Sequence, residues 1–255
     1  MGLMEGKKGL IVGVANERSI AWGIARALAR EGAELGFTYA FEALEKRVRP
    51  LAEEAGSDFV VELDVCDDAQ IDGVFEKVER HFGTIDFLVH AVAFSDKAEL
   101  KGNYYDTSRP NFLKTMDISV YSFTILSRKA LELMPDGGSL LTLSFYGARK
   151  VITNYNVMGV AKAALEASVR YLAVDMGPKN VRVNAISAGP IKTLASAGIS
   201  DFKEMLNQGA TRSPLGRNVT LDEVGNAGLY LLSDMSTATT GEVLFVDSGY
   251  HVTGV

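Results

Sequence analysis

Two tyrosine–lysine pairs in the middle of the sequence carry the residue types needed for acid catalysis beside a fixed positive charge. In one pair, Tyr155 and Lys162 are seven positions apart. Seven residues at about 100° each return to nearly the same azimuth, about 10 Å further along a helix. Both side chains would then face one cleft, with room for a sugar between them. A nearby ammonium group would lower the pKa of the phenol, so Tyr155 would stabilise an oxygen that gains negative charge.

The second pair, Tyr146 and Lys150, has a spacing of four. That spacing places two side chains on one face only where a helix exists. Gly147 follows the tyrosine, and the segment links a predicted strand to a predicted helix. We therefore favour Tyr155 and Lys162 as the functional pair. On spacing alone, both residues could also lie on the surface of an amphipathic helix.

Short apolar runs alternate with longer helical patterns along the chain of 255 residues. Continuous apolar runs are typical of parallel strands buried on both faces, and repeated strand–helix alternation indicates βαβ units. We predict an α/β class protein, residues 1–255, with a single-domain doubly wound Rossmann fold and a seven-stranded parallel sheet covered by helices on both faces. The strands are expected at 9–14, 34–39, 59–63, 87–92, 139–144, 181–186 and 242–246, and the helices at 19–31, 41–55, 68–82, 110–133, 155–176 and 221–233.

Residues that commonly begin or end helices support these boundaries. Ser19 can cap the first helix, and Gly32 follows that helix where a terminating glycine belongs. Asp67 precedes the third helix, and Gly177 with Pro178 should end the fifth.

The turn after the first strand has features that suit a dinucleotide. Gly13 would allow close approach of a pyrophosphate, and Ser19 begins a helix whose N-terminal N–H groups and dipole favour anions. Both residues could equally serve only to turn the chain and to cap the helix. The place of this turn in the first βαβ unit favours the nucleotide.

The expected adenosine end of the site is less specific. Ala40 and Phe41 follow the second strand, where NAD sites often have an acidic residue and NADP sites a basic one. The lack of a cation there mildly favours NADH over NADPH. Asp64, after the third strand, could accept a hydrogen bond from adenine or could simply begin a loop.

Composition excludes several other classes of protein. The net charge of −6 argues against binding to nucleic acid. A single cysteine, Cys66, excludes a disulfide framework, and three scattered histidines give no metal site. No apolar run reaches the length of about 18 residues that spans a membrane, and no signal peptide is visible. We therefore expect a cytoplasmic protein with no metal and no membrane partner.

Motifs with specific spacing occur along nearly the whole chain. They are Gly13-x5-Ser19-Ile20-Ala21-x-Gly23, Phe37-Thr38-Tyr39, Asp64-Val65, His90 to Phe94, Asn154-Tyr155-Asn156-Val157-Met158-Gly159-x-Ala161-Lys162 and Val181-Arg182-Val183-Asn184-Ala185-Ile186-Ser187-Ala188-Gly189-Pro190-Ile191-x-Thr193. From Gly6 to about Gly249, the chain resembles the bacterial NADH-dependent enoyl-[acyl-carrier-protein] reductases, a divergent branch of the short-chain dehydrogenases. The Tyr-x6-Lys spacing distinguishes this branch from its carbonyl-reducing relatives.

The resemblance implies hydride transfer from NADH to the β-carbon of a trans-2-enoyl thioester, the last step of the fatty-acid elongation cycle. It makes Tyr155 the catalytic tyrosine and Lys162 the lysine that binds the nicotinamide ribose. The NADH site would comprise Gly13, Ser19, Ile20, Asp64, Val65, Val92, Lys162, Ile191 and Thr193. The acyl pocket would comprise Ala93, Phe145, Tyr155, Met158, Ile199, Phe202 and Met205, with a mobile substrate loop at about 194–207.

The resemblance also implies two kinds of partner. Acyl carrier protein would deliver the substrate, and Lys192, Lys203 and Arg149 are candidates for a cationic patch that receives this acidic protein. A homotetramer is expected, with the helices at 110–133 and 155–176 packed between subunits.

Some residues depart from the pattern of the family. Phe145 stands where many members have tyrosine, and Ala40 replaces a polar residue near the adenosine ribose. Two rival functions remain. A 3-oxoacyl thioester reductase would need a lysine at position 159, where this chain has Gly159. A non-catalytic NAD-binding protein would bind cofactor without turnover.

Overall fold

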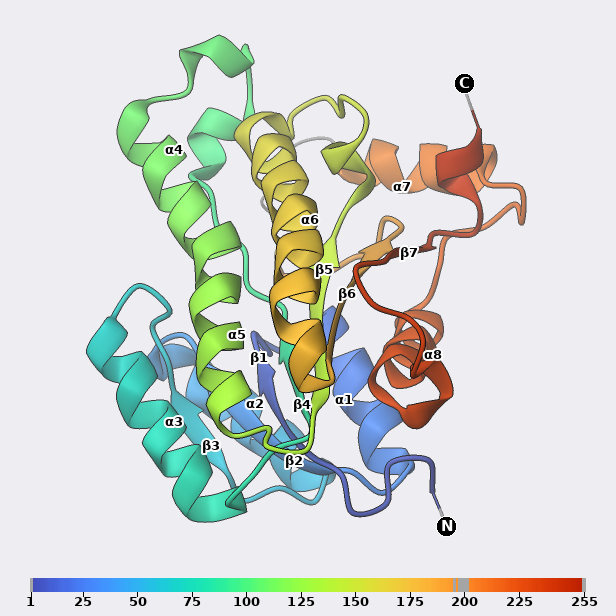
Figure 1. The fold of residues 1–255 in the computed structure, drawn as a ribbon. Coiled ribbons are helices and arrows are strands. Elements are labelled where there is room, and N and C mark those ends of the chain that lie inside the picture. The colour runs from blue at the N-terminus through green and yellow to red at the C-terminus, as the bar shows by residue number, and fades with distance from the viewer. Residues whose placement is uncertain (1, 195, 197–201, 254–255) are drawn as a thin grey trace.

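A parallel β-sheet passes through the centre of the molecule in the computed structural model, which describes residues 2–194, 196 and 202–253 (Figure 1). Within those residues, seven strands have the order β3-β2-β1-β4-β5-β6-β7. The chain leaves β1 in one direction along the sheet and returns at β4 in the other, which makes a topological switch point. The predicted fold class is confirmed. The strands are β1 (Lys8–Val12), β2 (Glu34–Tyr39), β3 (Val60–Glu62), β4 (Phe87–His90), β5 (Gly138–Ser144), β6 (Val181–Ala188) and β7 (Val243–Val246).

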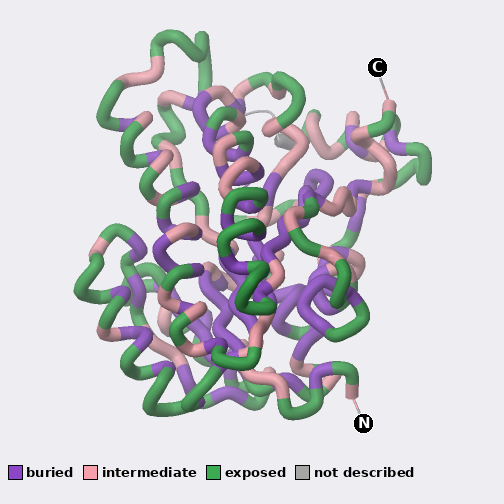
Figure 2. Tube along the Cα trace, viewed as in Figure 1, coloured by how far each residue is buried: buried purple, intermediate pink, exposed green. Residues whose placement is uncertain are grey.

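Helices cover both faces of the sheet and form two separate cores. One core packs under α3 (Asp68–Phe82), α5 (Ser122–Glu132) and α6 (Asn156–Met176), and the other under α1 (Ile20–Arg30), α2 (Glu42–Glu54) and α8 (Leu221–Leu232). Consecutive strand residues such as Leu10 and Ile11 belong to opposite cores, because side chains alternate across a strand. Figure 2 shows buried residues concentrated along the sheet and the inner sides of the helices.

Most of the predicted helix ends are confirmed. Gly32 follows the C-cap residue Glu31 of α1 and has a φ of +94°, as the left-handed terminating position requires. The Asp67 carboxylate accepts hydrogen bonds from the backbone N–H groups of Ala69 and Gln70 at the start of α3. Helix α6 ends at Met176, where Gly177 begins a short 3₁₀ turn.

The helix predicted at 110–133 differs from expectation in its middle. Helix α4 (Arg109–Met116) and α5 are joined by a π-helical turn at Asp117–Tyr121. This turn adds a residue to the helical repeat and directs the buried Ser119 toward the backbone of Phe94. Apolar periodicity does not reveal such a turn, because the apolar face continues on both sides of it.

The segment predicted as a loop at about 194–207 is helical in its second half. Helix α7 (Phe202–Arg212) contains the final six predicted loop positions. The amide of Asn218 donates to the Leu206 carbonyl at 2.9 Å and so fixes the helix against the following segment. The apolar residues Phe202, Met205 and Leu206 have helical spacing, a signal that our sequence analysis did not use.

Candidate functional site

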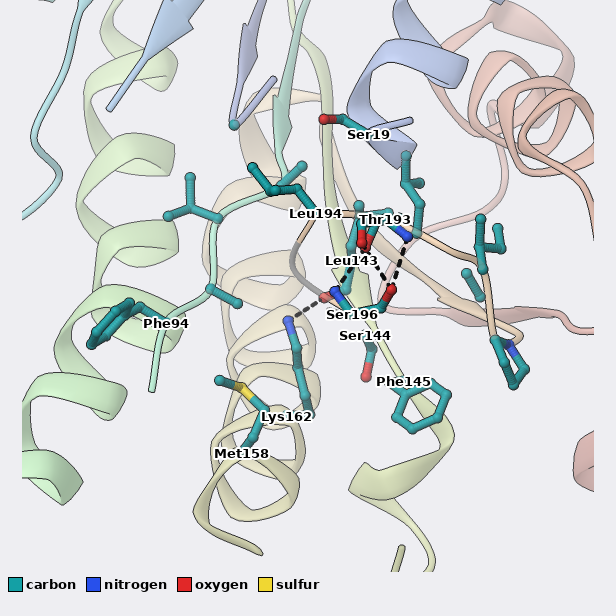
Figure 3. Close-up of a pocket in the computed structure, with 18 of the residues that line it drawn as sticks. Ser19, Phe94, Leu143, Ser144, Phe145, Met158, Lys162, Thr193, Leu194 and Ser196 are labelled. Atoms are coloured by element: carbon teal, nitrogen blue, oxygen red, sulfur yellow. Dashed lines mark hydrogen bonds between the residues drawn. The ribbon is translucent and has the colours of Figure 1, made fainter. Parts of the chain in front are cut away.

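A cavity of about 370 Å³ opens at the carboxyl edge of the sheet, beside the switch point (Figure 3). Its walls come from the segments that follow β1, β4, β5 and β6, and from the first half of α6. Ligands of doubly wound sheets bind at this location because loops diverge there and leave a crevice. Of the residues predicted from sequence, this cavity brings together Gly13, Ser19, Ile20, Val92, Ala93, Phe145, Tyr155, Met158, Lys162, Ile191, Thr193 and Met205.

The N-terminus of α1 presents unsatisfied donors to this cavity. Ile20 and Ala21 line it, and their backbone N–H groups have no hydrogen-bond partner within the described residues. Two orphan N–H groups at a helix N-terminus, together with the helix dipole, are suited to a phosphate group. The residues present therefore fit the pyrophosphate of a dinucleotide.

The Ser19 hydroxyl has a different role from the predicted helix cap. Its Oγ accepts hydrogen bonds from the backbone N–H groups of Ala15 and Asn16, at 3.0 and 3.1 Å, and makes no cap hydrogen bond to α1. The side chain points back into the loop because the loop donors are within its reach. Ser19 thus closes the loop after β1 and leaves the helix N–H groups free for a ligand.

Both the backbone conformation and the packing of the loops require a glycine at position 13. Its φ is +105°, and a Cβ atom there would lie 2.3 Å from the carbonyl oxygen of Ala91. The absence of a side chain at Gly13 brings the segment after β1 against the segment after β4, and its close approach to a pyrophosphate stays a prediction.

The predicted adenine contacts lie apart from the cavity. The side chain of Asp64 is exposed, and its Oδ1 accepts a hydrogen bond from the N–H of Cys66 at 2.9 Å. Val65 is buried in the core under α3. Neither residue lines the cavity, so the turn-forming role of Asp64 is established and its contact with adenine stays a prediction.

Tyr155 immediately precedes α6, at its N-cap position, and is only 6 % exposed. Its ring packs edge-on against Phe145, with centroids 5.1 Å apart. Gly147 leaves space for the ring, since a Cβ atom at that position would lie 2.5 Å from Tyr155 Cδ1. Burial raises the pKa of the phenol, which contradicts the lowered pKa that we expected from the lysine. Tyr155 is therefore a neutral hydrogen-bond donor.

Lys162 lies two turns further along the same wall of the cavity. Its ammonium group donates to the carbonyl oxygen of Leu143 at 2.7 Å, as the dashed line in Figure 3 marks. Burial lowers the pKa of Lys162 to about 8, and the nearby Glu166 carboxylate opposes that shift. Tyr155 and Lys162 both line the cavity, as predicted, but they do not share one helix: Tyr155 precedes α6 and Asn156 has a φ of +37°.

His90, at the end of β4, is a fully buried structural residue. Its Nε2 and Nδ1 lie 2.8 Å from Ser122 Oγ and 2.9 Å from Thr142 Oγ1. The Ser122 hydroxyl donates its own proton to the Ile118 carbonyl. The Ser122 oxygen therefore accepts a hydrogen bond from His90, whose Nε2 carries the proton. Burial lowers the pKa of His90 to about 3, with a further contribution from Lys162. The neutral imidazole therefore fastens β4 to β5 and α5 behind the cavity.

The predicted acyl pocket is only partly placed. Phe145, Met158 and Met205 give the cavity an apolar wall, and Ala93 lines it from the segment after β4. Ile199 and the side chain of Phe202 lie outside the described part of the chain. Thr193 and Ser196 exchange hydrogen bonds of 2.8 and 3.0 Å between backbone N–H and hydroxyl groups, which shape the segment after β6.

The rejected pair, Tyr146 and Lys150, lies outside the lining of this cavity. Tyr146 begins a 3₁₀ turn at Tyr146–Ala148, and its ring packs against Phe245 and Tyr250. The rejection of this pair from sequence is confirmed, since no α-helix places the two side chains on a common face.

The structure adds residues that our sequence analysis missed. The Leu143 carbonyl, Ser144, Phe94 and Ser196 all belong to the cavity. Leu143 and Ser144 end β5, so their position at the carboxyl end of a predicted strand was the available signal. Among the described residues, no group of acidic, histidine or cysteine side chains could hold a metal ion, and no helix has the length and apolarity to cross a bilayer.

The sheet order, the free donors at α1, and a buried tyrosine and lysine on one wall define the class of protein. These features are those of a nucleotide-dependent oxidoreductase of the short-chain dehydrogenase type. A family model described as enoyl-(acyl carrier protein) reductase matches residues 13–251. The chain belongs to this family of enoyl-acyl carrier protein reductases.

Individual relatives agree with this assignment. The chain is 62 % identical over 254 residues to enoyl-[acyl-carrier-protein] reductase [NADH] 1 of Rhizobium meliloti strain 1021, covering 100 % of this chain and 93 % of the relative. The solved enoyl-(acyl-carrier-protein) reductase of Anaplasma phagocytophilum in complex with NAD is 60 % identical, with a TM-score of 0.96, covering 100 % of this chain and 97 % of that one. A Bacillus cereus enoyl-acyl carrier protein reductase solved with NADP+ is 48 % identical, with a TM-score of 0.98 and full coverage of both chains.

Proposed function

We propose that this chain reduces the carbon–carbon double bond of trans-2-enoyl thioesters carried by acyl carrier protein, with NADH as the reductant. One observation carries the proposal: Tyr155 and Lys162, both more than nine-tenths buried, line one wall of the cavity beside the free donors of α1. When bound, NADH supplies the hydride that adds to the β-carbon of the substrate.

Tyr155 has the chemistry of an oxyanion stabiliser. Addition of hydride at the β-carbon places negative charge on the thioester oxygen as an enolate forms, and a proton taken up at the α-carbon then completes the saturated thioester. A neutral buried phenol donates a hydrogen bond to that oxygen, and this bond strengthens as the charge develops in a site of low dielectric. The apolar wall of Phe145 and Met158 excludes water from the same region.

Lys162 has a binding role in this proposal. Its position two turns from Tyr155 separates the charged group from the reacting oxygen, and its ammonium group would hold the hydroxyls of the nicotinamide ribose. The α1 N–H groups would bind the pyrophosphate, and Asp64 would contact adenine at the outer end.

The rival carbonyl reductase is disfavoured by packing as well as by residue type. A lysine four residues after Tyr155 would replace Gly159, and a Cβ atom at that position would lie 2.9 Å from the Gly147 carbonyl oxygen. A side chain there would push the 3₁₀ turn away from α6, and that turn supports the Tyr155 ring. The close contact between Gly147 and Gly159 therefore leaves no room for that lysine.

The preference for NADH rests on the turn after β2. Ala40 and Phe41 provide no cation for a 2′-phosphate, and Glu42 places negative charge in the first turn of α2, where Glu45 is paired with Arg49. The Glu42 carboxylate would repel the extra phosphate of NADPH. The Bacillus cereus relative solved with NADP+ makes the comparison between the two cofactors worth measuring directly.

A turnover assay tests the proposed function. Purified protein should oxidise NADH with crotonyl thioester much faster than NADPH with the same substrate, and should leave acetoacetyl thioester unreduced. Reduction of acetoacetyl thioester instead would favour the carbonyl reductase. Tight binding of NADH without turnover of either thioester would favour a non-catalytic NAD-binding protein.

The carrier protein is expected to dock beside the mouth of the cavity. Lys192 and Lys203 are exposed there, whereas Arg149 is engaged with Glu166 and with the Phe245 ring. Replacing Lys192 and Lys203 with glutamate should raise the KM for a carrier-bound enoyl substrate and leave the KM for its coenzyme A analogue unchanged. Equal effects on both substrates would remove this patch from the proposal. A cytoplasmic location remains part of the proposal and is testable by cell fractionation.

A further inference from the structure

Helix α6 carries a buried carboxylate one turn beyond Lys162. Glu166 is 5 % exposed and Lys162 is 7 % exposed, and residues four apart on a helix lie on the same face. A buried carboxylate is costly unless hydrogen bonds and opposite charges compensate it. The contacts of the Glu166 carboxylate therefore indicate the role of its negative charge.

Each oxygen of the Glu166 carboxylate has its own partner. Oε1 accepts a hydrogen bond from the Ser144 hydroxyl at 2.7 Å, and Oε2 lies 3.4 Å from the Arg149 Nε. Ser144 directly follows Leu143, whose carbonyl receives the Lys162 ammonium group. Two consecutive residues at the end of β5 are thus bonded to two side chains from consecutive turns of α6. Figure 3 shows the Leu143 end of this arrangement, with Lys162.

Apart from Glu166, the ionisable side chains described around Lys162 are neutral or positively charged. Tyr155 at the N-cap of α6 and His90 from β4 are both neutral in their buried positions. Lys97 also lines the cavity and carries a positive charge. Arg149, from the turn after β5, forms an ion pair with Glu166 rather than contacting Lys162. Among the described residues that line the cavity or contact these groups, Glu166 is the acidic side chain, one helical turn from Lys162 and without a direct ion pair to it.

We propose that Glu166 is a positioning residue that keeps Lys162 in its ammonium form and fixes β5 against α6, so that the lysine is charged when the cofactor binds. This inference rests on the proposed function, because it assigns Lys162 the ribose-binding role. The three side chains Arg149, Glu166 and Lys162 then form a row of alternating charges. In this row the exposed arginine partly offsets the stabilisation that the buried carboxylate gives to the ammonium form of the lysine.

The physical consequence is a charge state that depends on Glu166. Burial alone favours the neutral amine, and the carboxylate opposes it. Loss of an opposite charge one helical turn away shifts a titration by about one unit or more. A fall of about one unit from about 8 would leave only about half of the Lys162 side chains charged at pH 7.

The experiment measures Lys162 directly in the cofactor-free protein. Competitive labelling with acetic anhydride, followed by peptide mass spectrometry, gives the reactivity of each lysine against pH. In E166Q the Lys162 profile should move to lower pH by about one unit. In R149M, which removes the competing partner of Glu166, it should move slightly to higher pH. K150M is the matched control, because Lys150 is an exposed cation in the same turn without an ion pair to Glu166, and it should leave the profile in place.

The same variants are then compared in NADH binding by fluorescence. Affinity in E166Q should begin to fall at a pH about one unit lower than in the wild type. A Lys162 labelling profile in folded E166Q that coincides with the wild type would overturn the inference. If E166Q does not fold, R149M decides: a profile unchanged or shifted to lower pH would overturn it. A wild-type protein that fails to reduce crotonyl thioester would instead contradict the proposed function, whatever the labelling shows.

Discussion

Burial acts on the two central side chains in opposite chemical senses. It raises the pKa of Tyr155 and lowers the pKa of Lys162 to about 8, because it disfavours the charged form of each. The phenol therefore remains a donor at neutral pH, and the lysine is poised close to its own titration. Lys162 by itself does not lower the pKa of Tyr155 as we expected, since burial is the influence on that pKa and it raises it.

Separate substitutions should distinguish the roles of the two residues. Tyr155→Phe removes the donor to the developing oxyanion and should lower kcat by about 10²-fold or more, with the Kd for NADH little changed. Lys162→Met should chiefly raise the Kd for NADH. Stopped-flow turnover and fluorescence titration give the two quantities. Crotonyl thioester reduction at the wild-type rate in both variants would contradict these roles.

The pH dependence of cofactor binding follows from the lysine. The ammonium form is present below pH about 8 and is lost above it, so NADH affinity should fall as the pH rises through that value. The folded-state pKa lies below the ordinary value of 10.5, so the unfolded chain binds more protons between these values. This group should therefore raise the free energy of unfolding over the same range. Titration of NADH and urea unfolding at several pH values check both signs, and Lys162→Met should lose both trends.

At the scale of elements, two irregular segments determine the walls of the cavity. The π turn between α4 and α5 presents Ser119, whose hydroxyl lies 3.0 Å from the Phe94 N–H and 3.2 Å from its carbonyl oxygen. The 3₁₀ turn after β5 brings Gly147 against the Tyr155 ring. Both segments are short departures from regular geometry beside the cavity, where such departures position functional groups.

Removal of the Ser119 hydroxyl should loosen the segment after β4. Ser119→Ala leaves the Phe94 N–H without its partner, at a cost of about 1–3 kcal/mol in the free energy of unfolding. The KM for the thioester should rise more than the Kd for NADH, because Ala93 and Phe94 line the cavity and Ala93 is assigned to the proposed acyl pocket. Ser168→Ala is a suitable control, since its hydroxyl bonds only to the Ala164 carbonyl within α6. Equal behaviour of the two variants in urea and in kinetics would count against this role.

At the scale of the whole molecule, α6 has an outer face that a single chain leaves uncovered. Val160, Tyr171 and Val174 are 38 %, 76 % and 75 % exposed, although their helix is otherwise packed on the sheet. Exposed apolar side chains in a row on one element commonly mark an association surface. They support the proposal of a homo-oligomer, expected to be a tetramer, with this helix between subunits.

Charge introduced on that face should dissociate the oligomer. Tyr171→Glu combined with Val174→Glu would place two carboxylates in an apolar contact, so the sedimentation coefficient should fall to that of a smaller species. Lys77→Glu, on the exposed side of α3, is the control and should leave the assembly intact. A wild-type protein that sediments as a monomer would refute the proposal at once.

The amino-acid sequence alone determined the fold class, the order of the strands and helices along the chain, and the pair of residues at the site. Each of these depends on local spacing: apolar runs specify strands buried on both faces, and a spacing of seven across the start of a helix singles out Tyr155 and Lys162. The resemblance to known reductases rested on the same local motifs and is confirmed by the family match over residues 13–251.

The tertiary structure alone decided how the groups around that pair are used. It turned Ser19 into the loop, placed Gly13 against Ala91, inserted the π turn at Asp117–Tyr121, and paired Glu166 with Ser144 and Arg149. Each of these outcomes depends on which donors, acceptors and backbones from distant parts of the chain come within a few ångströms. Burial, and with it the charge states of Tyr155, Lys162 and His90, is likewise a property of the packed molecule, because only packing removes water from a side chain.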